Sequence, residues 1–352
     1  MGGNLEQTAP GMTGAKIYRS ITRKKYILIA VLISLCCISW LVDVMTGPAV
    51  ISANDVVKSV FHPDQVDGSI RVIVRSMRLP IAFMAIAVGA SLGLAGAVMQ
   101  TILCNPLASP YTLGVGAGAS FGASLAVITG TAVFLAMGEY IVSVNAFFFA
   151  MLVCLLIYFL GKVRGMSTDT MVLAGISMLF IFQALQALIQ YGASEGQVQT
   201  IVFWSFGSLQ KANWLKTAIV GGVVFICFPL IMRKSWAFTA LLMGEEKAES
   251  LGINVDRIKL FSFLMISLLA AAAVCFVGTI GFIGLAGPHI ARMVVGEEQR
   301  FYIPVSMLGG ALILSVASVI SKIMVPGVIF PIGIITSIIG VPFFIVLILR
   351  SK

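Results

Sequence analysis

About ten apolar segments follow one another along this chain, each near the roughly 20 residues that a helix needs to cross a bilayer. Backbone polar groups inside lipid must be satisfied within the protein, and a helix does this within each segment. Hydrophobic residues make up 59% of the 352 and charged residues only 11%, whereas soluble domains carry about 25% charged residues. The sequence therefore predicts an all-α polytopic membrane bundle of about ten transmembrane helices.

Short polar stretches separate these segments and leave no room for a sizeable soluble domain. We expect a single transmembrane domain over residues 26–350, preceded by a cytoplasmic tail over residues 1–25. The most charged stretch, about 235–257, must lie in water. The predicted spans are 26–45, 80–103, 113–137, 141–160, 170–191, 215–232, 258–277, 278–296, 302–321 and 332–349.

The charge of the chain is basic, with 23 Lys and Arg against 14 Asp and Glu. A nucleic-acid-binding domain gathers such residues on one surface, whereas here they form short clusters beside the apolar segments. The positive-inside rule then places both termini in the cytoplasm and excludes nucleic acid as the partner. The six cysteines form no C-x-x-C pair, which argues against a disulfide framework and a zinc site.

The stretch over residues 78–124 joins two glycine-rich spans through a polar elbow. Gly89 and Gly93 have the small-xxx-small spacing that lets two helix backbones approach closely in lipid. Proline removes a backbone donor and disfavours helix at the residue before it. The first of these spans should therefore end firmly at the elbow, whose marker residues are Asn105, Pro106 and Pro110.

Ionisable side chains are almost absent from the middle of the predicted spans, since Asp43, Glu139 and Asp169 all fall at span ends. A secondary transporter or channel would need intramembrane carboxylates or a charged selectivity ring. An intramembrane enzyme would need a set such as H-E-x-x-H or G-x-S-x-G, and we expect none in the spans. No G-x-x-x-x-G-K-[ST] loop occurs, so the chain has no nucleotide-binding site of its own.

Energy for any transport must therefore come from outside the bundle, and the charged stretch 235–257 is the obvious point of entry. Within it, GEEKAESLG at 244–252 predicts a short helix from Glu245 to Leu251, which ends at Gly252 as helices often do. Two interpretations remain open from the residues alone: a solvated loop, or a contact that receives force from a partner.

Six ordered motifs occur along the chain. They are RLP at 78–80, GxxLxLxGxxxQ at 89–100, NPLASPYTLGxxxGAxxGAS at 105–124, GEEKAESLG at 244–252, GTIGFIGLAGPHIAR at 278–292 and FPIGIITSIIGVPFF at 330–344. Together they resemble the FecCD-type permeases of ATP-binding-cassette (ABC) importers. The resemblance implies the type II importer permease fold, a homodimer or close heterodimer, two cytoplasmic ATPase subunits that use ATP and Mg, and an extracytoplasmic substrate-binding protein. The chain itself would bind no cofactor or metal and catalyse nothing.

The same resemblance implies roles for particular residues. Ser167 and Thr168 match the position of a cytoplasmic gate, although either hydroxyl could simply cap a helix. The ATPase-coupling helix would comprise Gly244, Glu245, Glu246, Ala248, Glu249, Leu251 and Gly252.

Docking of the binding protein would use Arg78 and Lys322, with Arg75 or Arg71 as a further basic contact. The chain departs from the family pattern around these positions. Ile81 stands where a second arginine is frequent, Ser318 and Lys322 stand where Asp and Arg are common, and Ile329 replaces a frequent Glu.

The cargo is expected to be a ferric siderophore, with haem or cobalamin as the alternatives, carried across the cytoplasmic membrane of a prokaryote. His289 invites a haem or metal ligand interpretation, but a structural hydrogen bond is favoured for a Pro-His pair in this motif. The 17 Met residues are scattered through the spans, so packing explains them better than a metal relay.

Overall fold

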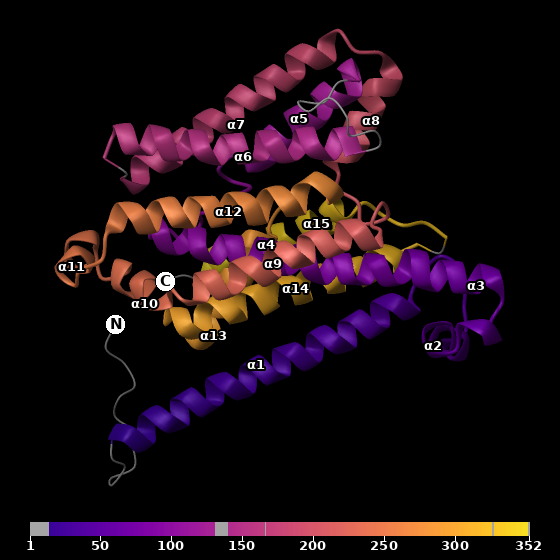
Figure 1. The fold of residues 1–352 in the computed structure, drawn as a ribbon, viewed down its shortest axis with the longest axis horizontal. Coiled ribbons are helices and arrows are strands. Elements are labelled where there is room, and N and C mark those ends of the chain that lie inside the picture. The colour runs from indigo at the N-terminus through magenta and orange to yellow at the C-terminus, as the bar shows by residue number, and fades with distance from the viewer. Residues whose placement is uncertain (1–13, 131–139, 166, 326, 351–352) are drawn as a thin grey trace.

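Helices form the regular structure of the described part of the chain, apart from an isolated antiparallel bridge between Val325 and Val328. The structure is a computed structural model that describes residues 14–130, 140–165, 167–325 and 327–350. Figure 1 shows the long helices lying roughly side by side. They are α1 (Gly14–Met45), α2 (Ala53–Phe61), η1 (Pro63–Gln65), α3 (Gly68–Val72), η2 (Ile73–Arg78), α4 (Leu79–Ile102), α5 (Val115–Thr129), α6 (Ile141–Val163), α7 (Thr168–Tyr191), α8 (Glu195–Ser205), α9 (Trp214–Met232), α10 (Ser235–Leu241), α11 (Glu245–Ser250), α12 (Val255–Val277), α13 (Ile283–Val295), α14 (Gln299–Ile323) and α15 (Ile332–Arg350).

The predicted membrane bundle is confirmed. Within the described ranges, seven helical segments are long and apolar enough to cross a bilayer, and three shorter apolar helices, α5, α13 and α15, accompany them. These ten elements occur at the ten predicted positions in the same order. The long segments are α1, the continuous α3-η2-α4 segment, α6, α7, α9, α12 and α14.

Two predicted boundaries are wrong, and one falls partly outside the described residues. α1 begins at Gly14, so residues 14–25 of the expected tail continue the first helix, because Lys and Arg are good helix formers and no Pro or Gly interrupts 15–25. The eighth span starts at Ile283 because Gly278 ends α12 with φ +76°. α5 ends before Gly130, and residues 131–137 of the predicted third span lie outside the described residues.

α4 forms the centre of the bundle and packs against α1, α9, α12, α13 and α14. Nearly its whole length is buried, including Gln100 and Thr101 at its far end. Figure 1 shows α5, α6, α7 and α8 as a separate layer that meets the centre through α12, and α1 on the opposite side. The most buried helix is therefore the one that the glycine pattern singled out.

The glycine spacing on α4 produces direct backbone contact with its neighbours. A Cβ atom on Gly89 would lie 2.8 Å from the Cα of Ala311 on α14, and one on Gly96 would lie 2.7 Å from the carbonyl carbon of Gly284 on α13. Real Cβ atoms essentially never come this close. The predicted close packing is confirmed, and any larger residue at these positions would push α4 away from α13 or α14.

α1 lies against α14, and a charge contact joins the N-terminal half of α1 to the start of α14. The Lys25 ammonium lies 2.8 Å from the Glu298 carboxylate, directly before α14, and 4.9 Å from the centre of the Phe301 ring. Asp43 near the end of α1 contacts Lys322 near the end of α14. The two helices therefore run in the same direction along the bundle.

Candidate functional site

The short helix α11 lies at one end of the bundle, far from α3 (Figure 1). Gly244 precedes it with φ +107° and Gly252 follows it with φ +82°, conformations that glycine adopts without strain. The Ile253 amide donates to the Ala248 carbonyl over 3.1 Å and the Gly252 amide donates to the Glu249 carbonyl over 2.8 Å, as in a Schellman cap. The predicted short helix is confirmed, with Leu251 as its cap residue.

One face of α11 is anchored to the bundle. Ala248 is fully buried within the main apolar core, and both Glu245 oxygens accept from the Lys259 ammonium on α12 over 2.7 and 2.8 Å. The Lys259 side chain is only 1% exposed. A buried ammonium without a counter-charge is costly, so this contact fixes α11 to the start of α12. The sequence analysis did not single out Lys259, although a lysine in the first turns of an apolar helix indicates that a counter-charge lies nearby.

The other face of α11 is open to solvent. Glu246, Lys247 and Glu249 are exposed, and Leu251 exposes about half of its surface. A rigidly anchored helix therefore presents two carboxylates and an apolar side chain outward.

The elbow after α4 is held by side chains that replace helical hydrogen bonds. The Asn105 side-chain oxygen accepts from the Leu107 amide over 2.9 Å, and the hydroxyls of Ser109 and Thr112 accept from each other's backbone amides over 3.1 and 3.0 Å. Such local contacts compete with helix continuation. The elbow is thus a built turn between α4 and α5, as Asn105, Pro106 and Pro110 predicted.

Ser167 and Thr168 lie beside this elbow and make different contacts. Ser167 caps α7, because its hydroxyl accepts from the Thr170 amide. The Thr168 hydroxyl donates over 2.9 Å to the carbonyl of Leu103, the residue that closes α4. The capping interpretation therefore holds for Ser167, and Thr168 ties the start of α7 to the end of α4. Their role as a gate stays a prediction.

The elbow and α11 lie at the same end of the bundle. Partial burial raises the pKa of the Cys104 thiol in the elbow, the negative charge of Glu245 raises it further, and the positive charge of Lys259 opposes this. Because charges shift a pKa only at close range, these effects place the elbow close to the contact between α11 and α12.

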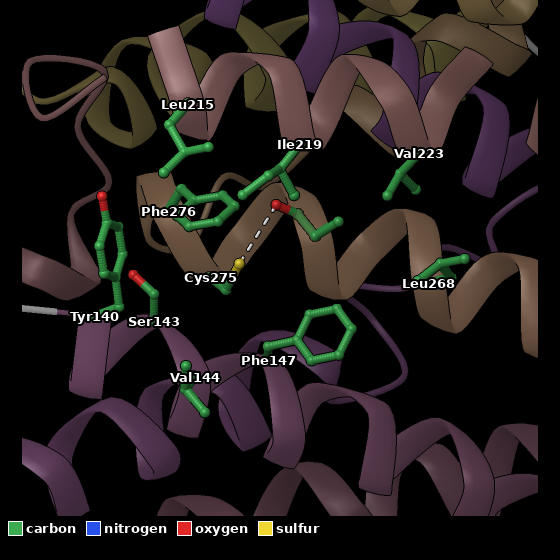
Figure 2. A pocket seen from close by; sticks show the side chains of 11 residues that line it. Tyr140, Ser143, Val144, Phe147, Leu215, Ile219, Val223, Leu268, Cys275 and Phe276 are labelled. Atoms are coloured by element: carbon green, nitrogen blue, oxygen red, sulfur yellow. Dashed lines mark hydrogen bonds between the residues drawn. The ribbon is translucent and has the colours of Figure 1, made fainter. Parts of the chain in front are cut away.

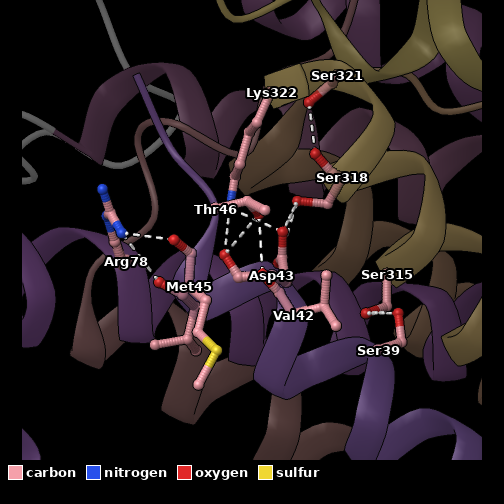
Figure 3. A network of polar contacts seen from close by, with 11 residues as sticks. Ser39, Val42, Asp43, Met45, Thr46, Arg78, Ser315, Ser318, Ser321 and Lys322 are labelled. Carbon is pink, nitrogen blue, oxygen red and sulfur yellow. Dashed lines mark hydrogen bonds and ion pairs between the residues drawn. The ribbon is translucent and has the colours of Figure 1, made fainter. Parts of the chain in front are cut away.

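Arg78 lies at the opposite end, where it is buried rather than presented to a partner. It is 4% exposed, and its guanidinium donates to the carbonyls of Val44 and Met45 at the end of α1, over 3.3 and 3.0 Å, and to the Ala49 carbonyl (Figure 3). A cation at a helix C-terminus satisfies free carbonyls and complements the dipole. Arg78 is therefore not presented to a partner in this structure, since its hydrogen-bonding groups are used within the chain, and its docking role stays a prediction.

Lys322 is also buried and paired within the chain, and its docking role likewise stays a prediction. Its ammonium lies 2.7 Å from the carboxylate of Asp43, and the side chains are 4% and 0% exposed. Ser318 donates to the same carboxylate over 2.9 Å (Figure 3). Asp43 lies near the end of α1, 279 residues from Lys322. The sequence placed both residues at span ends but not together, because nothing in a single sequence links such distant positions.

The residues that depart from the family pattern gather in one place. A narrow hollow at this end of the bundle is lined by Ile81, Ser318, Lys322 and Ile329, together with Phe330 and neighbouring residues. Replacing one of these residues therefore changes the surroundings of the others. Arg75 lies nearby on the exposed side of η2, so the structure leaves it accessible where Arg78 and Lys322 are not.

The expectation that the spans contain no G-x-S-x-G sequence is wrong. Two occur, at residues 89–93 in α4 and 118–122 in α5. Both central serines are buried inside helices, and Ser91 donates over 2.8 Å to the Leu269 carbonyl on α12. A catalytic serine of this kind needs a strained strand-to-helix turn that exposes its hydroxyl. The glycines serve helix packing instead, and these sequences do not make an enzyme site.

A hollow of about 270 Å³ lies where α8, α15 and the segment between α12 and α13 meet the elbow. Its polar groups are hydroxyls, and no carboxylate lines it. Among the described residues no group of three or more His, Cys, Asp and Glu could hold a metal, and His289 lies half-buried in α13. The lining comprises Tyr111, Ser205, Phe206, Thr279, Gly281, Gly333, Ile334, Ser337 and Ile338.

The sequence matches a known protein family over most of its length. The FecCD transport family matches residues 30–350. The chain belongs to that family.

Relatives of this FecCD protein are named as permeases of ABC transporters or of import systems. An ABC transporter permease of Methanocaldococcus jannaschii is 38% identical over 340 residues, covering 95% of this chain and 97% of that protein. The iron(III)-citrate import permease YfmE of Bacillus subtilis is 33% identical over 323 residues, covering 91% and 93%. A structure described as an inward-facing metal-chelate type ABC transporter has a TM-score of 0.79 at 28% identity, covering 92% of this chain and 99% of that one.

The FecCD chain is thus a multi-pass permease subunit of a prokaryotic ABC importer with the type II permease fold. Such subunits lack ATPase activity and work with ATPase and binding-protein partners, and no cofactor is expected for this chain.

Proposed function

We propose that this FecCD permease carries a ferric siderophore across the cytoplasmic membrane by alternating access, driven by partner ATPase subunits through α11. The observation that carries the mechanism is the two-sided character of α11, which is fixed to the bundle through Ala248 and Glu245 and open to solvent through Glu246, Glu249 and Leu251. A helix that is rigidly attached on one face transmits a push received on the other. In this proposal the α11 end faces the cytoplasm.

The assembly would contain a second permease subunit, forming a homodimer, two cytoplasmic ATPase subunits and an extracytoplasmic binding protein. Large apolar side chains on the described outer surface support burial against lipid or a second subunit, with Leu173, Phe180 and Leu188 of α7 more than 60% exposed. Both termini would lie in the cytoplasm, because the start of α1 lies at the same end as α11.

The cargo assignment rests on the hydroxyl-lined hollow beside Tyr111 and on the names of relatives. A wall without charge suits a bulky neutral or weakly charged chelate, because a buried charge would need a counter-charge that the lining does not offer. Iron(III) citrate is named for two relatives, and other relatives are named for hemin, cobalamin and molybdate. Haem or cobalamin is therefore the alternative cargo.

The binding protein would dock at the α3 end through Arg75 and Arg71. Arg75 is exposed, and Arg71 lies 3.7 Å from the carboxylate of the exposed Asp64. Arg78 and Lys322 would act indirectly by holding the end of α1 in place. Ser167 and Thr168 would form the cytoplasmic gate, with the Thr168 bond to the Leu103 carbonyl breaking when α7 moves.

Uptake by the complete complex in liposomes tests the function. The permease, its ATPase and its binding protein are reconstituted together, and radioactive iron in a siderophore is followed with and without internal ATP. We expect uptake only with ATP. Uptake that persists without nucleotide would support a secondary transporter or channel and overturn the proposal, and ATP-dependent uptake of haem or cobalamin alone would overturn the siderophore assignment.

Coupling through α11 is tested by replacing its exposed carboxylates. Glu246→Gln with Glu249→Gln should uncouple ATP hydrolysis from uptake while leaving the permease folded. Asp256→Asn provides the matched control, because Asp256 is also exposed but lies in the first turn of α12. Equal coupling in both variants would show that α11 does not receive the ATPase.

A further inference from the structure

An apolar cavity of about 370 Å³ lies on the side of the bundle, away from the hydroxyl-lined hollow. α12 packs against both α6 and α9, and the cavity opens between these two helices with α12 as its floor (Figure 2). Its lining comprises Tyr140, Ser143, Val144 and Phe147 of the α6 wall, Leu215, Ile219 and Val223 of α9, and Leu268, Ala272, Cys275 and Phe276 of α12.

This cavity is bordered by helices that are long and apolar enough to span a membrane. α6, α9 and α12 are all long and apolar enough to span a bilayer, and the cavity lies at the end where α6 and α9 begin and α12 ends. Interiors close-pack, and atoms that face a void lose their dispersion contacts. An empty cavity of this size is therefore unfavourable, and an apolar chain that entered it would restore these contacts.

Basic and polar groups mark one end of the cavity. Lys216 lies between the lining residue Leu215 and the buried Thr217 on α9, and its ammonium lies 5.7 Å from the centre of the Tyr140 ring. It also donates over 3.1 Å to the carbonyl of Lys211, a second basic residue, which is exposed. The hydroxyls of Tyr140 and Ser143 lie at this same end in Figure 2.

We propose that this cavity is a binding site for one acyl chain of an anionic phospholipid, whose phosphate is held by Lys216. The apolar lining accepts the chain, and the ammonium at the cavity mouth complements the negative charge of the headgroup at the depth where α9 leaves the membrane. Lysine is a common phosphate-binding residue and acts as a point charge on the phosphate oxygens. The lipid would fill the gap between the α6 and α9 walls.

Native mass spectrometry of the delipidated protein tests the proposal. The full chain is titrated with phosphatidylglycerol, with phosphatidylcholine, and with free glycerol phosphate. Wild-type protein should retain one tightly bound phosphatidylglycerol, bind phosphatidylcholine more weakly, and show no competition from glycerol phosphate. Lys216→Gln should weaken phosphatidylglycerol binding about fivefold, the effect of one basic residue near an anionic membrane surface, without changing phosphatidylcholine binding.

Ser143→Phe provides an independent test because it fills the cavity from the α6 wall and should remove the tight site for both lipids. Lys234→Gln, at the opposite end of α9, and Ala218→Phe, on the exposed side of α9, are the matched controls and should bind like wild type. Circular dichroism and gel filtration verify folding, and Lys216→Gln decides alone if Ser143→Phe does not fold. Unchanged phosphatidylglycerol affinity in Lys216→Gln, equal binding of both lipids by wild type, or full competition by glycerol phosphate would each overturn the proposal.

Discussion

The ion pair between Asp43 and Lys322 allows a sharp test of whether Lys322 stabilises the bundle or contacts a binding protein. The two side chains are 0% and 4% exposed, and the carboxylate also accepts from Ser318. Removing one partner of a buried pair leaves an uncompensated charge and costs about 3–5 kcal/mol. Asp43→Asn and Lys322→Met should therefore each lower the free energy of unfolding by about that amount.

The double substitution separates the pair energy from other effects. Once either charge is gone, removing the other relieves the uncompensated charge, so the double variant should cost less than either single variant. The coupling energy should therefore be about 3 kcal/mol or more, at or above the upper end of the range for residues in contact. For the exposed pair Arg71 and Asp64, 3.7 Å apart, a coupling energy of at most about 1 kcal/mol is expected.

The assay is equilibrium unfolding of the four proteins in mixed micelles, alongside their affinity for the binding protein in nanodiscs. If the pair is structural, Asp43→Asn and Lys322→Met should affect binding-protein affinity alike, because both act through the position of α1. A coupling energy near zero would refute the buried pair. A loss of affinity confined to Lys322→Met, with stability unchanged, would restore Lys322 as a docking contact.

Three further predictions follow from other contacts. Glu245→Gln should lower the pKa of Cys104 by removing a negative charge, so maleimide should label Cys104 faster near pH 7.5, and Glu246→Gln should leave the rate unchanged. Gly93→Val should force α4 away from α14 and cost at least the roughly 1–3 kcal/mol of core overpacking, measured by thermal unfolding against Gly221→Val, where a Cβ meets nothing. Arg78→Met should speed hydrogen exchange in the last turn of α1, and unchanged protection there would contradict the capping role.

Local patterns in the sequence predicted the helices, the elbow and α11, because each depends on nearby residues. Hydrophobic runs mark the spans, proline and Asn105 mark the elbow, and Gly252 marks the end of α11. The glycine spacing on α4 also predicted close packing, although it could not say that α13 and α14 would be the partners.

The roles of Arg78 and Lys322 could not be predicted in this way. A basic residue at a span end is equally consistent with solvent exposure and with burial against a distant carboxylate or carbonyl. The deciding partners, Asp43 and the carbonyl of Met45, lie far away in the sequence. The resemblance to a family supplied docking roles, whereas only the folded chain shows that these side chains are already engaged.

The charge contacts that hold α1 to α14 also set an order of assembly during synthesis. Asp43 leaves the ribosome 279 residues before Lys322, a delay of about 15–55 s at ordinary rates of translation. During that interval the first helix sits in the membrane with its carboxylate unmatched and Lys25 without Glu298. α1 therefore completes its contacts late, and a nascent chain that stalls before α14 leaves the Asp43 carboxylate in the membrane without its counter-charge.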